Sequence, residues 1–472
     1  MPSARRPDIF LFMPDQMHRE TVGPGGLCRT PNFDALASRG TAFSRAFTPT
    51  PICTPARAST FTGMLPHQHR LLHNAHMTYP KQRTLPAGLT TFADELRAAG
   101  YATFYTGKWH VGTDEPTDHG FDRVETASAS ATCDDRLVSE RVLVPNRCPD
   151  KNVLAATTAQ DRDDTEPWQV CRSTADFIRC HHQSEPDRPF LAFASTSAPH
   201  VPWFTPASYV STYDAGALQP WPNYGDDLAD KPESWRKHYN GYDYCRLAGN
   251  WPRAAHALTH YYGMITLIDE AFGLVVEALE TTSRLDNTLI VVASDHGELM
   301  GRHGLFGKNE MLSEDLIRIP LTVSWPAQLG GGRSLDAIVT LCDLFPTLLD
   351  AAGAGGSGTD ARAGRSLLPL MKDGQASVWP DEVYLQHHGD LQYNLVRAVR
   401  GRRFKYVYWA NDRDELYDLH LDPWEQRNLA ADARYVDLLD AQRERLLHHM
   451  TETDDPFLRG VRANLQNRPI RS

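Results

Sequence analysis

Four short apolar runs constrain the fold more than any other feature of this sequence, because each ends close to a residue that can do chemistry. The runs and the residues that follow them are 9–13 before Asp15, 102–105 before Lys108, 190–194 before His200 and 289–293 before Asp295. In open α/β sheets, ligands gather outside the carboxyl ends of the strands, where loops bring together side chains that are distant in the sequence. The pattern therefore predicts four strands and a single cleft at their ends.

Helical patterns lie between these runs. Residues 90–99 end at Gly100, and residues 261–279 have the long amphipathic spacing of a helix. Strands that alternate with helices are typical of a layered α/β domain. Because 472 residues can bury a large core, we expect one large domain over 1–375 and a smaller one over 376–472.

One segment of the large domain departs from this alternation. Residues 125–188 are rich in Asp, Arg, Thr and Ser, show no clear strand periodicity and hold four of the eight cysteines. We expect an elaborated insertion near the cleft, with a surface excursion of no function as the alternative.

The last part of the chain has the pattern of an antiparallel sheet. A flexible connection rich in Gly and Ala, residues 352–364, precedes the boundary expected near residue 375. Three short β-type runs and a terminal helix follow, at 395–399, 404–409, 415–419 and 435–450.

Charge and apolar content limit the partners. Lys and Arg number 48 against 59 Asp and Glu, a formal net charge of −11, which argues against nucleic acid as a partner. The first apolar run is too short for a signal-peptide core or a membrane span. The eight cysteines form no C-x-x-C pair, so we expect reduced thiols. These features predict a cytoplasmic protein without membrane contact, as a monomer or a homo-oligomer.

Cys53 opens the pentapeptide C-T-P-A-R. By itself, Cys53 could be a buried structural cysteine beside a proline turn, since free cysteine is among the most buried residue types. Arg57 lies one helical turn later, where a guanidinium can hold an oxyanion. The pentapeptide matches the C-x-P-x-R signature of type I sulfatases, and the chain resembles that family. In the family, a separate formylglycine-generating enzyme oxidises this cysteine to formylglycine.

The resemblance implies that residue 53 is the nucleophile. One hydroxyl of the hydrated aldehyde attacks the sulfur of the ester. The sulfated gem-diol then collapses to the aldehyde and expels sulfate without a second attack by water. A thiolate would instead leave a stable thiosulfate, so the modification solves the problem of turnover.

Two residue pairs have the shape of the sulfatase metal-ligand motifs, Asp15-Gln16 and Asp295-His296. The resemblance implies one divalent metal ion bound by these four residues and by Cys53, which lowers the pKa of the nucleophile and neutralises charge on the transferred group. The amide oxygen and the imidazole make the site less acidic than one with four acidic ligands. Ca²⁺ is favoured, and Mn²⁺ or Mg²⁺ stay open. Taken singly, Asp15 could cap a loop and His296 could be a hydrogen-bonded core histidine.

Four further residues match sulfatase positions. In T-G-K-W-H, the resemblance implies that Lys108 contacts the sulfate and that His110 contacts the formylglycine, and alternation at a strand end puts both on one side. His200, in A-P-H, is implied as the general acid that protonates the leaving oxygen. Lys308 is implied as the second sulfate-binding lysine. The alternatives are a turn histidine and surface lysines.

Two residues have weaker support as substrate contacts. Asn74 lies 21 positions after Cys53 and matches a substrate-contacting asparagine of phosphonate monoester hydrolases, while His303 lies between the metal pair and Lys308. The Asp-Gln and Asp-His pairs also resemble those enzymes.

Three functions therefore stay open. The chain could hydrolyse small-molecule or carbohydrate sulfate esters, hydrolyse phosphonate monoesters or phosphodiesters at the same site, or be a non-catalytic relative in which Cys53 stays unmodified. The G-K-W-H segment favours sulfate esters, whereas Asn74 and Gln16 favour phosphonates. In each case the resemblance implies an alkaline-phosphatase-like α/β fold, with a large mixed sheet between helices and a smaller C-terminal α+β domain that contains an antiparallel sheet.

Overall fold

The four predicted strands lie side by side in a central sheet of eight strands. The computed structural model describes residues 5–77, 80–125, 138–143, 153–236, 247, 249–308, 311–355, 362–373, 379–389 and 393–468. The strand order is β11-β2-β10-β9-β1-β7-β3-β4, in which the predicted strands are β9 (Thr288–Ala293), β1 (Asp8–Pro14), β7 (Phe190–Thr196) and β3 (Ala102–Gly107). These four are mutually parallel, so their carboxyl ends share one edge of the sheet.

The outer strands make the sheet mixed. They are β2 (Thr41–Phe47), β4 (Arg123–Glu125), β10 (Leu321–Ser324) and β11 (Arg333–Thr340). β10 runs antiparallel to both β9 and β2, while the other pairings are parallel. Every residue of β1, β7 and β9 is buried, which explains their continuous apolar runs, because helices cover both faces of the sheet.

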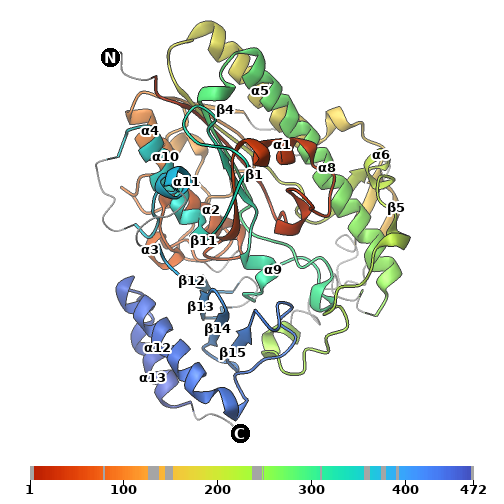
Figure 1. Cartoon of the computed structure of the whole chain (residues 1–472), viewed down its shortest axis with the longest axis vertical. Helices are drawn as coiled ribbons and strands as arrows, with labels where there is room; N and C mark the ends of the chain where they lie inside the picture. The colour runs from red at the N-terminus through yellow and green to blue at the C-terminus, as the bar shows by residue number, and fades with distance from the viewer. Residues whose placement is uncertain are drawn as a thin grey trace.

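Helices cover the two faces as separate layers (Figure 1). One layer consists of α1 (Pro31–Arg39), α5 (Glu166–Ser184) and the long α8 (Trp251–Thr281). The other contains α2 (Cys53–Thr62), α4 (Phe92–Ala98), α10 (Leu344–Ala351) and α11 (Leu368–Asp373). Three further helices are short: α3 (Pro66–His69), α6 (Ala207–Val210) and α9 (Glu314–Ile317). The predicted helices at 90–99 and 261–279 correspond to α4 and α8.

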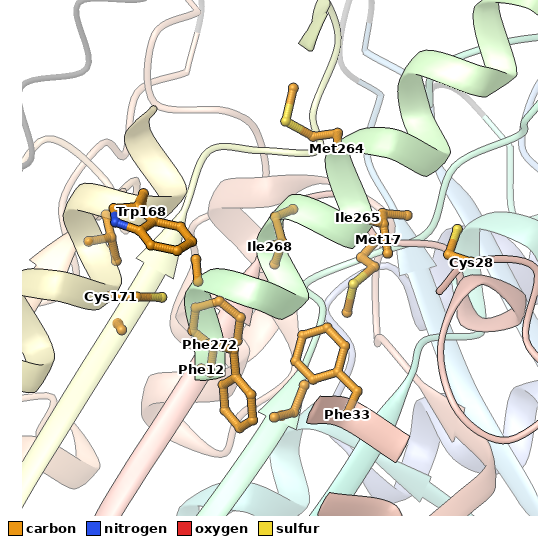
Figure 2. Close-up of a cluster of buried hydrophobic side chains, with 14 of the residues drawn as sticks. Phe12, Met17, Cys28, Phe33, Trp168, Cys171, Met264, Ile265, Ile268 and Phe272 are labelled. Atoms are coloured by element: carbon orange, nitrogen blue, oxygen red, sulfur yellow. The ribbon is translucent and has the colours of Figure 1, made fainter. Parts of the chain in front are cut away.

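Large apolar side chains join the sheet to the α1, α5 and α8 layer. Phe12 of β1 packs against Phe33 of α1 and Phe272 of α8, with ring centroids 6.2 and 5.4 Å away (Figure 2). Trp168 and Cys171 of α5 reach the same cluster. The aromatic rings contribute much of the buried apolar area that holds these layers together.

Residues 125–188 differ from the insertion that the sequence predicts. Within this segment, α5 is a core helix, and its Phe177 ring stacks on Phe104 of β3 with centroids 4.4 Å apart. A second part forms β5 (Val138–Leu143) and β6 (Val153–Thr158), which join β8 (Trp203–Pro206) in a small sheet. One face of α5 is exposed and polar, so the average composition of the segment did not indicate a core helix. The buried residues of α5 nevertheless recur at helical spacing.

The last part of the described chain forms an antiparallel sheet, as predicted. Its strands are β12 (Glu382–His387), β13 (Val396–Gly401), β14 (Phe404–Trp409) and β15 (Glu415–Asp418), in that order. Helices α12 (Val436–Glu452) and α13 (Leu458–Gln466) cover it (Figure 1). Strand β12 and helix α13 were not predicted from the sequence. Residue 375 and much of the predicted flexible connection lie outside the described residues, and the division into domains 1–375 and 376–472 stays a proposal.

The cysteines of the described chain are free thiols. They are Cys28, Cys53, Cys171, Cys180 and Cys342. Cys133, Cys148 and Cys245 lie outside the described residues. Within the described ranges, no helix combines the length and the apolar character needed to cross a membrane.

Candidate active site

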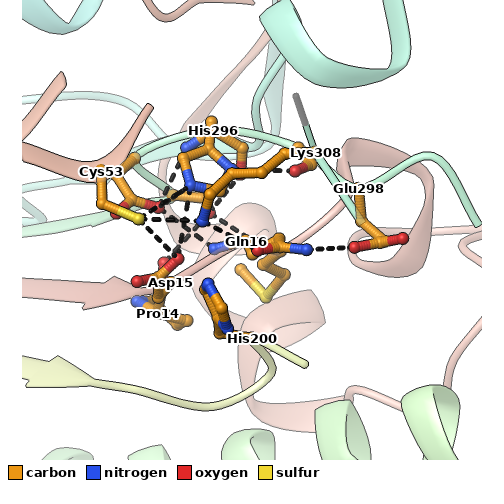
Figure 3. A network of polar contacts seen from close by, with 12 residues as sticks. Pro14, Asp15, Gln16, Cys53, His200, His296, Glu298 and Lys308 are labelled. Carbon is orange, nitrogen blue, oxygen red and sulfur yellow. Dashed lines mark hydrogen bonds and ion pairs between the residues drawn. The ribbon is translucent and has the colours of Figure 1, made fainter. Parts of the chain in front are cut away.

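The Cys53 side chain lies at the centre of a buried polar cluster (Figure 3). Cys53 is the first residue of α2 and is 1% exposed. The ammonium group of Lys308 lies 2.9 Å from its sulfur, and that of Lys108 lies 3.8 Å away. His296 Nε2 is 3.4 Å from the same sulfur. A nucleophile in this position is surrounded by groups that favour negative charge.

The two lysines change the acid–base character of the thiol. Burial by itself raises the pKa of Cys53. Lys108, Lys308, His296 and a hydrogen bond with His110 together outweigh burial, so that the pKa lies well below its ordinary value. Cys171, in the apolar core, shows the opposite effect, because burial there raises the pKa of the thiol. The cluster therefore stabilises an anion at position 53, and an oxyanion placed there would meet the same two cations.

Three ligand-type side chains converge on Cys53. Asp15 and Asp295 follow β1 and β9, and His296 comes next in the chain; all three are 0% exposed. The ligand atoms of these residues and of Cys53 all lie within 4.8 Å of one another. The imidazole is oriented as in many metal sites, because its Nδ1–H donates to the Gly297 carbonyl at 2.9 Å and Nε2 faces the cluster. Two carboxylates and an imidazole are a suitable donor set for a divalent cation.

Gln16 completes the donor set. Its side chain is oriented by Glu298, a residue for which the sequence predicted no role. The Gln16 side chain donates from Nε2 to the buried carboxylate of Glu298, so that its amide oxygen faces Lys308 at 3.1 Å (Figure 3). Glu298 also accepts from the backbone N–H of Met300 at 3.2 Å. Burial raises the pKa of Glu298. Glu298 follows His296 by two positions, but nothing in the sequence indicated that it orients Gln16.

Arg57 links α2, which begins at Cys53, to the carboxylates of the cluster. Its Nε donates to Asp295 at 2.9 Å, and its Nη1 donates to the Ser195 hydroxyl at 2.8 Å and to the Lys108 carbonyl at 2.9 Å. Its Nη2 lies 3.8 Å from Asp15 and is buried without a hydrogen-bond partner among the described residues. Arg57 therefore fixes three segments and keeps one N–H group available for an oxyanion.

Two histidines flank the cluster. His110 has a positive φ of 51°, and its ring stacks on the exposed ring of His76 with centroids 5.7 Å apart. Burial lowers the pKa of His110, although a hydrogen bond to Cys53 acts in the opposite direction. His200 lies beside Asp15 and Gln16 in Figure 3. Its Nδ1 donates to the Val201 carbonyl at 2.6 Å, which leaves Nε2 free to exchange a proton.

The two weaker candidates have structural partners. Asn74 accepts a hydrogen bond from the backbone N–H of Thr54 at 3.2 Å, so it caps the first turn of α2. His303 pairs with Asp226 at 2.7 Å and packs against Trp235. Direct contact of either residue with substrate stays a prediction.

The mixed sheet, its helical layers and the C-terminal antiparallel sheet define an α/β protein of the alkaline-phosphatase-like fold. The sequence profile described as Sulfatase matches residues 7–354, and one described as "N-sulphoglucosamine sulphohydrolase, C-terminal" matches residues 301–452. The chain therefore belongs to the sulfatase family, and it is a sulfuric ester hydrolase.

Relatives in the family span nearly the whole chain. The uncharacterized sulfatase YidJ of Escherichia coli is 29% identical and covers 96% of this chain and 89% of its own length. The choline-sulfatase of Rhizobium meliloti is 31% identical, with 91% and 83% covered. The crystal structure of the phosphonate monoester hydrolase of Agrobacterium radiobacter superposes with a TM-score of 0.77 at 24% identity, with 95% of this chain and 96% of that one covered.

Proposed function

We propose that this protein hydrolyses sulfate esters of small molecules or carbohydrates to an alcohol and inorganic sulfate, using residue 53 as a formylglycine nucleophile. The observation that carries the proposal is the position of the Cys53 sulfur, between the Lys308 ammonium at 2.9 Å and the His296 imidazole at 3.4 Å. The sulfur occupies the place that a hydroxyl oxygen of the hydrated aldehyde would take. A formylglycine-generating enzyme is then a required partner during maturation.

The side chains around residue 53 divide the work of sulfate transfer. Lys108 and Lys308 bind the sulfate oxygens and neutralise the charge that they carry. The free N–H group of Arg57 orients the hydrated aldehyde. The carboxylates of Asp15 and Asp295 lie close to residue 53, where they can accept a proton or bind a cation. Because the transferred group is held on several sides, its sulfur can be aligned with the attacking oxygen.

A divalent metal ion fits the same cluster. Asp15, Gln16, Asp295 and His296 would hold it, with residue 53 as a further ligand. Ca²⁺ is the ion that we propose, and Mn²⁺ and Mg²⁺ accept the same oxygen donors. When bound, such an ion lowers the pKa of the nucleophile and neutralises charge on the sulfate. Glu298 keeps the amide oxygen of Gln16 turned toward this position.

His200 is the proposed general acid, and its importance should depend on the leaving group. His200→Ala is expected to lower kcat/KM on the order of 10²–10⁴-fold for an alkyl or sugar sulfate and much less for nitrophenyl sulfate, whose phenolate departs without a proton. A series of esters with different leaving-group pKa values measures this dependence. His110→Ala is the matched control, and it should slow all esters by similar factors. Equal losses for His200→Ala across the series would rule out its role as the acid.

A phosphonate monoester hydrolase is the second candidate. It is favoured by the Asp15-Gln16 and Asp295-His296 pairs and by the structural likeness to the Agrobacterium enzyme, which shows the fold. We expect kcat/KM to be higher for sulfate monoesters than for phenyl phosphonate monoesters with the same leaving group. Steady-state kinetics with purified protein that carries the aldehyde checks this preference. A higher kcat/KM for the phosphonates would reverse the assignment.

The cytoplasmic location stays a prediction that cell fractionation can test.

A further inference from the structure

A cavity of about 270 Å³ lies where the edge of the central sheet meets the β13–β14 hairpin. Four arginines line it, together with Asp336 and His420: Arg45, Arg318, Arg400 and Arg402. None of them belongs to the cluster around Cys53. The cavity is several times larger than the roughly 30 Å³ that one water molecule occupies in the liquid.

Two of the four arginines have carboxylate partners. Arg400 forms a two-pronged pair with Glu314, at 3.1 and 2.7 Å. Arg402 donates to Asp336 at 2.8 Å and to Asp381 at 2.9 Å. These two guanidinium groups therefore share three carboxylates within the protein.

The other two arginines lack such a partner. Arg45 donates to the carbonyl of Arg402 at 3.0 Å, and no carboxylate of the described residues forms an ion pair with it. Arg318 donates to the carbonyl of Ser44 at 2.6 Å, and its Nε is buried without a partner among the described residues. The carboxylate that pairs with Arg318 is Glu314, at 3.9 Å, which Arg400 already holds. The four arginines thus face three carboxylates, Glu314, Asp336 and Asp381, so that about one positive charge remains without a counter-charge.

Mutual repulsion within this arginine cavity shows in the pKa values. Burial lowers the pKa of Arg45, and Arg400 and Arg402 lower it further. Burial, Arg19 and Arg400 together lower the pKa of Arg318 to about 10. The fold therefore keeps like charges close together although the whole chain carries a formal charge of −11. An anion in the cavity would relieve this repulsion.

We propose that the arginine cavity is a second binding site, for a tetrahedral dianion such as a sulfate or phosphate group. The planar guanidinium presents parallel N–H groups that match the oxygens of such an anion, and several arginines around one cavity can contact it from different sides. The anion is either free in solution or attached to a saccharide chain whose reacting ester lies in the active site. Each source gives a different experimental result.

Titration calorimetry with inorganic sulfate tests the site. Wild-type protein is expected to bind two sulfate ions per chain, one in the active site and one in the arginine cavity. Arg45→Ala should bind one, whereas Arg179→Ala, which removes an exposed arginine of α5, should bind two. In sulfate-free buffer, Arg45→Ala should unfold at the same or a higher temperature than wild type, because a repelling charge is gone. Binding of the same number of sulfate ions by Arg45→Ala and by wild type would overturn the proposal.

A sulfated oligosaccharide distinguishes the two sources of the anion. If the cavity takes a sulfate group of a saccharide chain, Arg45→Ala should bind the oligosaccharide about tenfold more weakly than Arg179→Ala does. If it takes the free ion, both variants should bind the oligosaccharide equally, and only the titration with inorganic sulfate should differ. Neither source survives if Arg45→Ala matches Arg179→Ala in both titrations.

Discussion

Cys53→Ala is expected to lower kcat/KM for a sulfate ester by at least about 10⁴-fold, because it removes the nucleophile while the binding groups remain. Folding should change little, since the substitution leaves only a small cavity at the start of α2. In active wild-type protein, peptide mass spectrometry should show an aldehyde at residue 53 in place of the thiol.

Cys171→Ala provides the matched control for this prediction. Both cysteines are buried, but the pKa of Cys171 is raised by its apolar surroundings and no lysine lies against its sulfur. The Cys171→Ala variant should therefore keep its kcat/KM and its aldehyde. Fully active protein with an unmodified thiol at residue 53 would contradict the formylglycine mechanism.

Asp295→Asn is expected to lose both the metal ion and activity, by about 10⁴-fold. Asp295 accepts hydrogen bonds from Arg57 at 2.9 Å and from the backbone N–H of Gln16 at 3.1 Å, so its carboxylate is held in place inside the cluster. The amide removes one negative ligand and leaves Arg57 with only the more distant Asp15, at 3.8 Å, as a charge partner. Loss of a metal ion forfeits several kcal/mol of charge stabilisation, and each 1.36 kcal/mol corresponds to a tenfold change in rate. Elemental analysis after dialysis, together with steady-state kinetics, measures both effects.

Asp8→Asn is the control for a lost buried carboxylate. Asp8 opens β1 at the end opposite Asp15 and pairs with Arg284 at 2.7 Å. This variant should lose stability but retain the metal and most of its kcat/KM. Asp15→Asn should behave like Asp295→Asn. Stoichiometric metal in both Asp15→Asn and Asp295→Asn would show that the ion binds elsewhere.

The central strands and the residues at their ends could be predicted because their signals are local. The apolar runs of β1, β3, β7 and β9 are continuous since both faces of the sheet are covered, and each run leads directly into its polar residue. The structure brings Asp15, Lys108 and Asp295 to one edge of the sheet, where parallel strands end together. The antiparallel strands near the C-terminus were found for a similar reason, since turn residues separate them.

Helices and strands whose position depends on packing with distant segments were harder to predict from the sequence. Helix α5 lies in a segment whose average composition is polar, and only its packing against β3 and α8 shows which face is buried. Strand β12 pairs with β13, but the sequence gives only a weak signal that a turn joins these two strands. In both cases, distant partners and not local composition determine the element.

The sequence by itself determined the family and provided the residues proposed as the nucleophile and the metal ligands, because a short motif encodes chemistry within a few consecutive residues. Tertiary structure alone decided how these groups are oriented and which residues support them. Glu298 holds Gln16 from 282 positions away, and Arg57 reaches Asp295 across 238 positions. The arginine cavity likewise joins β2 to the β13–β14 hairpin, which are more than 350 positions apart at Arg45 and Arg402. Such contacts depend on the folded path of the chain, since hydrogen bonds and charge repulsion act over distances in space and not along the sequence.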